Sequence, residues 1–190
     1  MRFDTYFDVT ILPDPDIPAW DCTGKVWRML HSAGVKSQVE FAVSFPGWMS
    51  DGFTLGKDIR FFAQGTPAIE RFYDRLEEVP RFDEFAAASR VRQVKRIESF
   101  EAYMMCRLPG GISRARKTIP LDTQQQLREQ AKLRRMAEQQ HLPFVRMRSS
   151  SGTQFRLTIE RVAALETHQG KPSSYGLSRA TQIVAVPVLA

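Results

Sequence analysis

The stretch FDVTILPDPDIPAWDCTGKVWRMLHSAG, residues 7–34, predicts a strand followed by an amphipathic helix. Its first five residues alternate between apolar and polar side chains, as in a half-buried strand. After a proline-rich link, large apolar side chains recur at helical spacing: Trp20, Val26, Trp27 and Leu30. This helix is expected to span about four turns and to end near Gly34.

The next residues continue the same alternation of strand and helix patterns. Alternating apolar side chains at 39–45 and the segment KDIRFFAQ at 57–64 predict two strands. Apolar side chains then fall at helical spacing from Ile69 to Val79, and a basic segment at 90–98 is interpreted as a fourth strand. The order β-α-β-β-α-β is that of a ferredoxin-like unit.

The rest of the chain is less regular. A polar, basic region at 99–117 is interrupted by LPGG at 108–111, where proline and glycine disfavour a helix. Asp122 and Thr123 are candidate N-caps for a basic helix that ends near residue 140.

Three further strands are expected, at 142–148, at 155–159 and at 183–189. The fold class is therefore expected to be α+β. A ferredoxin-like domain is expected over 1–98, followed by a C-terminal domain over 99–190 that contains the basic helical segment and a small β region.

Charge is distributed unevenly along the 190 residues, whose formal net charge is +6. Residues 1–85 hold 9 Lys and Arg against 14 Asp and Glu, whereas residues 86–190 hold 18 against 7. Arginine makes up 14 of those 18, and guanidinium groups bind phosphate in a bidentate manner and stack on bases. The second half is thus predicted to bind nucleic acid, with a solvated basic face of no function as the alternative.

Several classes of function lack sequence support. No apolar run approaches the roughly 18 residues of a membrane span and no signal peptide is recognised, which predicts a cytoplasmic protein without a membrane partner. Two cysteines and three histidines disfavour a metal site, so neither a metal nor a cofactor is expected. No Walker loop, GxGxxG, GxSxG or HExxH motif occurs, which leaves metal-free acid and base chemistry.

His31 is the histidine placed most suggestively for such chemistry. The pattern puts it in the last turn of the first helix, where the negative end of the helix dipole would raise its pKa. A lone histidine at a helix end is also typical of a packing or capping residue, and this alternative is left open.

The basic residues favour a folded RNA as the ligand. Some ferredoxin-like units stack bases on aromatics of their central strands, but residues 57–64 lack the glycine and spaced aromatics of that signature. Positive charge is concentrated instead in the predicted strand at 90–98, the segment after it and the long helix. This arrangement suits contact with an RNA stem from outside.

Several short motifs, in the same order along the chain, resemble one protein family. They are DVTILPDPDIP at 8–18, MLHSAG at 29–34, VSFP at 43–46, RQVKRIE at 92–98, LPFVRMRSSSGTQFRL at 142–157 and SSYGLS at 173–178. The chain is similar in these motifs to the Csy-type Cas6 endoribonucleases that process CRISPR repeats in type I-F systems.

The resemblance implies a metal-independent nuclease. Such enzymes cleave the CRISPR repeat stem-loop of pre-crRNA at its 3′ foot by attack of a ribose 2′-OH on the adjacent phosphate, leaving a 2′,3′-cyclic phosphate. His31 matches the family's general base, Ser149 the serine that positions the 2′-OH, Ser151 a second active-site serine, and Tyr175 the tyrosine that orients the histidine. The family also implies that the enzyme stays on the 3′ hairpin with other effector-complex subunits as partners.

Three residues match positions that contact bases. Phe155 matches an aromatic that stacks at the foot of the stem, although its alternation with Leu157 predicts a core position equally well. Arg96 matches an arginine that reads a guanine edge. Glu98 stands where the family has glutamine, and period-2 spacing would put it on the same face as Arg96. A changed repeat sequence or a lost base contact would explain Glu98.

Two groups of basic residues are candidates for the phosphate contacts. The first follows the segment at 90–98 and comprises Arg107, Arg114, Arg116 and Lys117. The second is a stripe on the long helix at i, i+4 and i+7: Arg128, Lys132 and Arg135. The alternatives to the nuclease are an RNA-hairpin-binding subunit of a ribonucleoprotein that does not cleave, and a general RNA-binding protein of ferredoxin-like fold.

Overall fold

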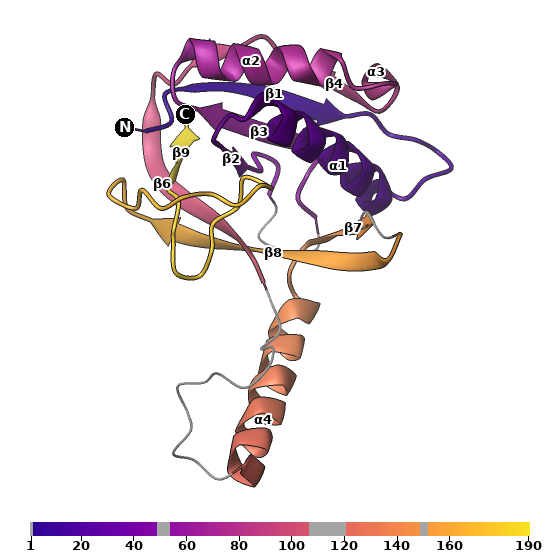
Figure 1. Cartoon of the computed structure of the whole chain (residues 1–190), viewed down its shortest axis with the longest axis vertical. Helices are drawn as coiled ribbons and strands as arrows, with labels where there is room; N and C mark the ends of the chain where they lie inside the picture. The colour runs from indigo at the N-terminus through magenta and orange to yellow at the C-terminus, as the bar shows by residue number, and fades with distance from the viewer. Residues whose placement is uncertain (1, 49–53, 107–120, 149–151) are drawn as a thin grey trace.

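The computed structural model describes residues 2–48, 54–106, 121–148 and 152–190. These residues form two antiparallel β-sheets and four helices of different lengths (Figure 1). The strands of the first sheet are β1 (Thr5–Ile11), β2 (Phe41–Ser44), β3 (Asp58–Ala63), β4 (Ala86–Ala88) and β5 (Arg92–Gln93). The helices of this part are α1 (Ala19–Ser37), α2 (Thr66–Glu77) and α3 (Phe82–Phe85).

The first sheet has the strand order β2-β3-β1-β4, with β5 also paired to β1. Together with α1 after β1 and α2 after β3, this order is that of a ferredoxin-like unit, so the expected fold class is confirmed. Buried and partly exposed residues alternate along β1, as its sequence predicted. Phe7 of β1 stacks on Phe61 of β3 at 5.4 Å and packs against Phe72 of α2 at 5.7 Å.

Helix α1 extends past its expected end. It continues to Ser37 and is closed by Gln38 in the left-handed conformation. Gly34 lies inside the helix, where a Cβ would overlap the ring of Phe41. This glycine therefore permits close packing of α1 on β2, and does not end the helix.

The expected fourth strand at 90–98 is wrong in its bounds. The sheet is completed instead by β4 and β5, which pair with the two ends of β1, while Ile97 already belongs to the second sheet. The apolar residues Val91, Val94 and Ile97 recur every three positions and not every two, and the backbone N–H of Val94 donates to Asp4. Residues 94–96, which join β5 to β6, therefore connect the two sheets and are not part of a strand.

The second sheet has the strand order β7-β8-β6-β9. Its strands are β6 (Ile97–Met105), β7 (Phe144–Arg148), β8 (Gln154–Ala164) and β9 (Val186–Leu189). Strand β6 corrects the expectation of an irregular region from residue 99. Because β6 pairs on one side with β8 and on the other with β9, its partners are distant in sequence and local patterns do not reveal them.

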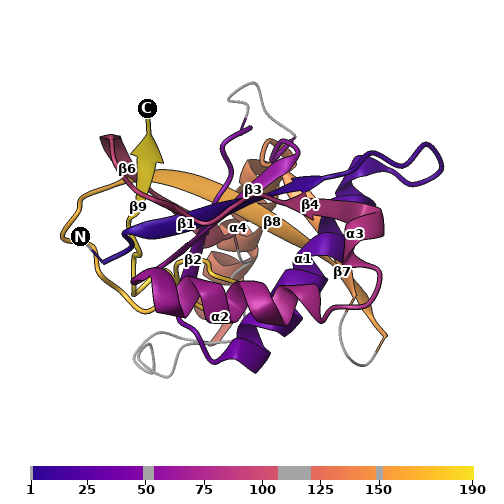
Figure 2. The ribbon, with the colours of Figure 1, turned by 90° about the horizontal axis from the view of Figure 1, so that it is seen from above.

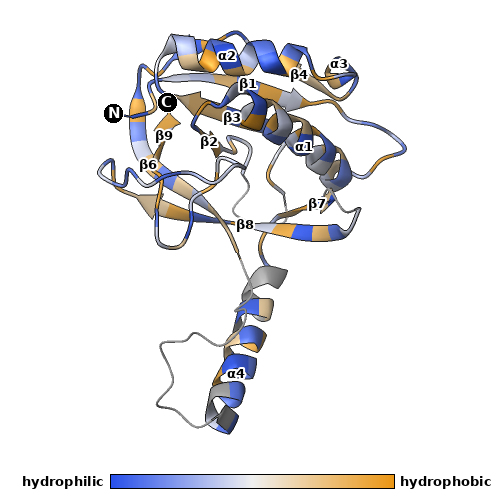
Figure 3. Cartoon of the chain, viewed as in Figure 1, coloured by the Kyte–Doolittle hydropathy of each residue, from blue (hydrophilic) through white to orange (hydrophobic). Residues whose placement is uncertain are grey.

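Helix α4 (Leu121–Gln140) confirms the predicted basic helix and extends away from the two sheets (Figure 1). It already begins at Leu121, so the candidate N-caps Asp122 and Thr123 lie inside its first turn, and their expected capping role is wrong. Colouring by hydropathy shows that many of its coloured residues are hydrophilic (Figure 3). The sheets share one hydrophobic cluster, in which Val145 and Leu157 of the second sheet join Phe7 and Phe61 of the first. Figure 2 shows β8 running across the strands of the first sheet. The division into domains at residue 98 stays a prediction.

Candidate active site and nucleic-acid interface

His31 lies on α1 close to two deeply buried side chains. Trp27, one turn before it, and Leu30, beside it, are fully buried. The ring of Trp27 packs edge-on against Phe45, which directly follows β2, with the ring centroids 5.3 Å apart. His31 itself is half-buried. Because α1 continues to Ser37, His31 lies well inside the helix and not in its last turn, which corrects the sequence expectation.

Tyr175 stacks on His31. The centroids of the two rings are 4.2 Å apart and their planes meet at 23°. The two residues are distant in sequence and lie on different elements, since Tyr175 belongs to the segment between β8 and β9. The structure thus brings together two of the residues that the sequence motifs singled out, and Tyr175 limits the orientations open to the imidazole.

The loop that carries Tyr175 is fixed by its own hydrogen bonds. Ser173 accepts from Gly176 N–H at 2.9 Å and from Leu177 N–H through its side-chain oxygen at 3.2 Å, while its own N–H donates to the Leu177 carbonyl. Gly176 has φ +75°, and a Cβ there would lie 2.8 Å from side-chain atoms of Phe41 and Val43. The SSYGLS motif therefore builds a rigid support for Tyr175.

Burial lowers the pKa of His31 from its ordinary value of 6.5. The sequence expectation of a raised pKa is wrong, because desolvation of the half-buried ring outweighs a helix dipole whose end is more than a turn away. A lowered pKa keeps the imidazole neutral at pH 7. In that state one ring nitrogen can accept a proton.

Strand β7 is packed against the helix that carries His31. Phe144 stacks on Trp20 of α1, with centroids 6.1 Å apart, and a Cβ at Gly24 would overlap the carbonyl oxygen of Arg146. Ser149 and Ser151 come directly after β7 and lie outside the described residues. The described contacts fix the strand that precedes them relative to α1.

Phe155 lies near the start of β8 and opposite Met147 of β7. Its side chain is 38% exposed, whereas Leu157, two residues further along the same face, is 2% exposed. The open alternative of a core position is therefore wrong for Phe155. Its ring is accessible at the edge of the sheet.

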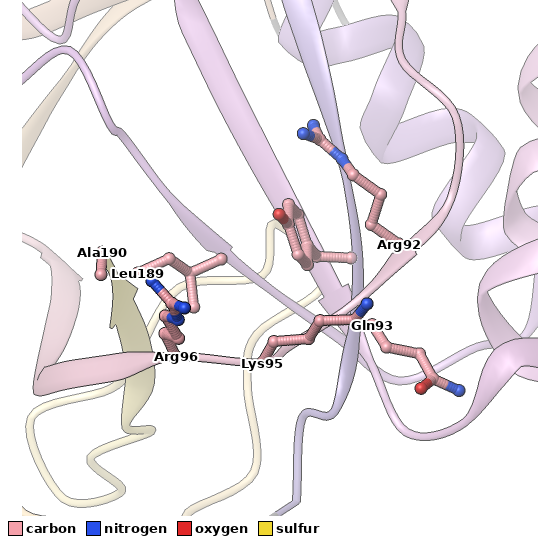
Figure 4. A pocket seen from close by; sticks show the side chains of 7 residues that line it. Arg92, Gln93, Lys95, Arg96, Leu189 and Ala190 are labelled. Atoms are coloured by element: carbon pink, nitrogen blue, oxygen red, sulfur yellow. The ribbon is translucent and has the colours of Figure 1, made fainter.

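Arg96 and Glu98 are both exposed, beside the point where the chain passes between the sheets. Arg96 lines a hollow of about 660 Å³ together with Lys95, Arg92 and Tyr6 (Figure 4). Glu98 lies where the pairing of β6 with β9 shifts register, so the period-2 argument that joined it to Arg96 does not apply there.

The basic stripe on α4 is only partly available to a ligand. Arg135 forms an ion pair with Glu160 of β8 at 2.6 Å, which ties the helix to the second sheet. Lys132 is exposed and Arg128 is half-buried. The other group of expected phosphate contacts, Arg107, Arg114, Arg116 and Lys117, lies outside the described residues.

A second hollow, of about 570 Å³, lies beside Tyr175. Arg135 and Arg179 are among the residues that line it, together with Ser178 and Met105. Arg179 was missed by the sequence analysis, although it directly follows the SSYGLS motif. Ser178 fixes this part of the chain, because its hydroxyl both accepts from the Val184 N–H at 2.9 Å and contacts the Val184 carbonyl at 3.3 Å.

Two absences hold for the residues that the structure describes. Within them, His, Cys, Asp and Glu do not gather in groups of three or more that could hold a metal ion. None of the described helices combines the length and the apolar character needed to cross a membrane.

The chain is similar to CRISPR-associated proteins. The model of the family described as CRISPR-associated protein (Cas_Csy4) matches residues 6–189. The CRISPR-associated endonuclease Cas6/Csy4 of Pseudomonas aeruginosa (strain UCBPP-PA14) is 30% identical over 192 residues, which cover 93% of this chain and 96% of that protein. Among solved structures, an RAMP protein binding different RNA substrates is 12% identical over 98% of this chain and 99% of its own, with a TM-score of 0.42. A Cas6 product complex is 13% identical over 98% and 100%, with a TM-score of 0.30.

Proposed function

Because the chain belongs to the Csy4-type Cas6 family of CRISPR-associated proteins, we propose that it is an endoribonuclease that cleaves CRISPR repeat stem-loops in pre-crRNA. The observation that carries the proposal is the His31–Tyr175 stack, in which a half-buried, neutral imidazole is held by a rigid loop. A base that is neutral at pH 7 and fixed in orientation suits abstraction of a hydroxyl proton.

In the proposed reaction the nucleophile belongs to the RNA. A nitrogen of His31 takes the proton of the 2′-OH at the 3′ foot of the stem, and that oxygen attacks the adjacent phosphorus. The bond from phosphorus to the 5′ oxygen of the next nucleotide breaks, and the leaving oxygen takes a proton. The products are a 2′,3′-cyclic phosphate and a 5′-OH, and the reaction needs no metal in this scheme.

The remaining active-site residues act by positioning. Ser149 would hold the attacking 2′-OH, with Ser151 as a second contact in the same segment. Tyr175 holds the plane of the His31 ring, which supports its role as the positioning residue for the base. The packing of β7 on α1 supports this arrangement, because it fixes the strand that leads into the serine segment.

Binding of the stem would combine stacking with contacts to bases and phosphates. The exposed ring of Phe155 is available to stack on the last base pair. Arg96 is exposed and lies beside Lys95 and Arg92, which suits the reading of a guanine edge, with Glu98 as a second base contact. Phosphate contacts are assigned first to Arg107, Arg114, Arg116 and Lys117, and second to Arg128, Lys132 and Arg135.

Retention of the product follows from the same division of contacts. Most of these residues face the stem, which cleavage leaves intact, so the cleaved hairpin stays bound. The enzyme would then remain on the 3′ hairpin of the crRNA as a subunit of a type I-F effector complex.

The test uses a repeat stem-loop RNA in buffer that contains EDTA. The full chain should cleave it at the 3′ foot of the stem and leave a cyclic phosphate, detected by mass spectrometry of the product. An RNA with a 2′-deoxy nucleotide immediately 5′ of the scissile phosphate should bind equally well and stay intact. Tight binding without cleavage of the all-ribose RNA would instead identify a hairpin-binding subunit that does not cleave.

A further inference from the structure

The outer face of the β7–β8 hairpin gathers arginines at unusually close spacing. Arg146 and Arg156 lie directly opposite each other on the two strands, and Arg148 lies two residues further along β7 on the same face. All three side chains are exposed. Like charges placed directly opposite across a sheet are destabilising, so this arrangement does not serve the stability of the hairpin.

Aromatic rings are interleaved with these arginines. The guanidinium carbon of Arg156 lies 3.7 Å from the ring centroid of Phe144, which in turn stacks on Trp20 of α1. The guanidinium carbon of Arg146 lies 5.9 Å from the centroid of the Trp20 ring. Trp20 is a large aromatic at the surface, with 43% of its area exposed. We call Trp20, Phe144, Arg146, Arg148 and Arg156 the arginine–aromatic patch.

Asp21 balances little of the charge of Arg146. Asp21 reaches Arg146 only at 3.7 Å, near the limit of an ion pair, and the Arg146 side chain is 56% exposed. An exposed pair at this distance contributes little stability. The patch therefore offers a combination of positive charge and exposed aromatic area to a ligand.

The patch lies on the hairpin that also carries the proposed RNA contacts of the active site. Phe155, the ring proposed to stack at the foot of the stem, is next to Arg156 in sequence but lies on the opposite face of the hairpin, with Met147 and Leu157, and β7 leads into the serine segment. In the proposed complex, an RNA strand that continues beyond the foot of the stem would run past this hairpin and reach its outer face. We propose that the arginine–aromatic patch binds single-stranded RNA that flanks the repeat stem.

The chemistry of the patch favours a single strand over a duplex. Bases inside a stem are stacked on each other and offer no free face to Trp20 or to a guanidinium plane, whereas unpaired bases do. Phosphates of the same strand would pair with Arg146 and Arg148. Both the strand that enters the stem and the strand that leaves it after the scissile phosphate have this chemistry. The inference rests on the proposed function, because it assumes a stem-loop substrate.

The experiment compares three RNAs by fluorescence anisotropy with the full chain. They are a repeat stem-loop alone, the stem-loop with a 5′ flank of about eight nucleotides, and the stem-loop with a 3′ flank of that length, protected by a 2′-deoxy nucleotide at the cleavage site. Wild-type protein should bind one flanked RNA at least about fivefold more tightly than the stem-loop alone. The RNA that gains identifies which flank occupies the patch.

The variants W20A and R146Q/R156Q should abolish this gain and leave the affinity for the bare stem-loop within about twofold. The matched control R71Q removes an exposed arginine from α2 and should retain the gain. The double variant should also flatten the salt dependence of the gain, by about 0.7 in slope for each lost phosphate contact.

Two outcomes would overturn the proposal. Equal affinity of the wild type for the three RNAs would show that the patch does not bind flanking RNA, and would favour an acidic protein surface as its ligand. An equal loss of affinity for all three RNAs in the double variant would show that the patch binds the stem itself. In both cases cleavage of an all-ribose stem-loop with the 3′ flank would show that the proposed function itself still holds. Failure to bind the bare stem-loop, or to cleave the all-ribose RNA with the 3′ flank, would instead contradict the proposed function.

Discussion

The arginines of the first unit and those of the β7–β8 hairpin are used in opposite ways. In the first sheet, Arg60 makes a bidentate contact with Asp8, at 2.7 and 3.2 Å, and Arg92 approaches the same carboxylate at 2.5 Å. On the hairpin, Arg146 faces another arginine, Arg156. The first arrangement neutralises charge within the fold, and the second accumulates it at the surface.

This difference shows that the arrangement of charged residues, more than their number, distinguishes a surface suited to binding from one that stabilises the fold. The acidic half of the chain supplies the imidazole of His31, and the basic half supplies Tyr175 and the exposed arginines. Because one hydrophobic cluster joins the two halves, His31 is held at a fixed position relative to the basic surface. We expect the general base to come from the first half and most of the affinity for RNA to come from the second.

The variant H31A tests this division most strongly. Removal of the proposed general base should lower the cleavage rate by about 10²- to 10⁴-fold, measured in single-turnover assays. Affinity for the stem-loop should stay within about twofold, because the proposed role of His31 lies in the chemistry and not in binding the stem. A comparable loss of affinity and of rate would show that the two halves do not divide the work in this way.

The salt dependence of binding should be the next largest effect. If about six basic residues of the second half contact phosphates, affinity for the stem-loop should fall by about 10³-fold between 50 and 200 mM salt. R71Q, on the acidic half, should leave the slope unchanged. A flat response to salt would contradict a binding surface built from the arginines of the second half.

The pH dependence should reflect the lowered pKa of His31. In the proposed reaction cleavage needs the neutral imidazole, so the rate should hold as the pH falls to 6.5 and then decrease about tenfold per unit below the lowered pKa. The free energy of unfolding should also decrease as the pH falls below 6.5, because the unfolded chain takes up the proton more readily. Titration of the ring by NMR in wild type and in Y175F measures the pKa directly. A midpoint above 6.5 would contradict the role of burial.

The elements of the first unit could be predicted because their patterns are local. Alternation along residues 7–11 and the helical spacing from Trp20 to Leu30 gave β1 and α1, and burial in the structure follows these patterns. The end of α1 could not be predicted, because Gly34 reads as a helix terminator unless the ring of Phe41 against it is known. Strand β6 was missed because its two partner strands are distant in sequence.

The candidate site shows the same limit. The sequence motifs singled out His31 and Tyr175, and in the structure the rings of these two residues are stacked. The direction of the His31 pKa shift was wrong, since desolvation by packing is a tertiary effect. The arginine–aromatic patch was missed because the register of β7 against β8, which sets Arg146 opposite Arg156, and the contact of β7 with α1 are both properties of the fold.

The variant G24A probes the contact that joins the two halves. In an exposed helix, alanine in place of glycine usually adds about 1 kcal/mol of stability. Here the new methyl group would overlap the Arg146 carbonyl, and such overpacking costs about 1–3 kcal/mol. Thermal unfolding should therefore show a lower melting temperature, and cleavage should slow as β7 moves from α1. R28A, an exposed position on the same helix, is the control and should leave both unchanged. Stabilisation by G24A would contradict the close approach.

The variants R60Q and R146Q compare an arginine that stabilises the fold with one that lies on the exposed patch, and their expected effects on stability are the smallest of those proposed. Arg60 and Asp8 are mostly buried, and Arg60 also lies 4.7 Å from the Tyr6 ring, so R60Q should lower the free energy of unfolding by about 1–2 kcal/mol. Arg92 still contacts Asp8, which keeps the loss at this level. R146Q should leave stability unchanged or slightly higher, since it relieves repulsion from Arg156. Urea denaturation measures both. Stem-loop affinity should stay the same in R60Q, so a loss of RNA binding there, or of stability in R146Q, would show that the two groups of arginines are not used differently.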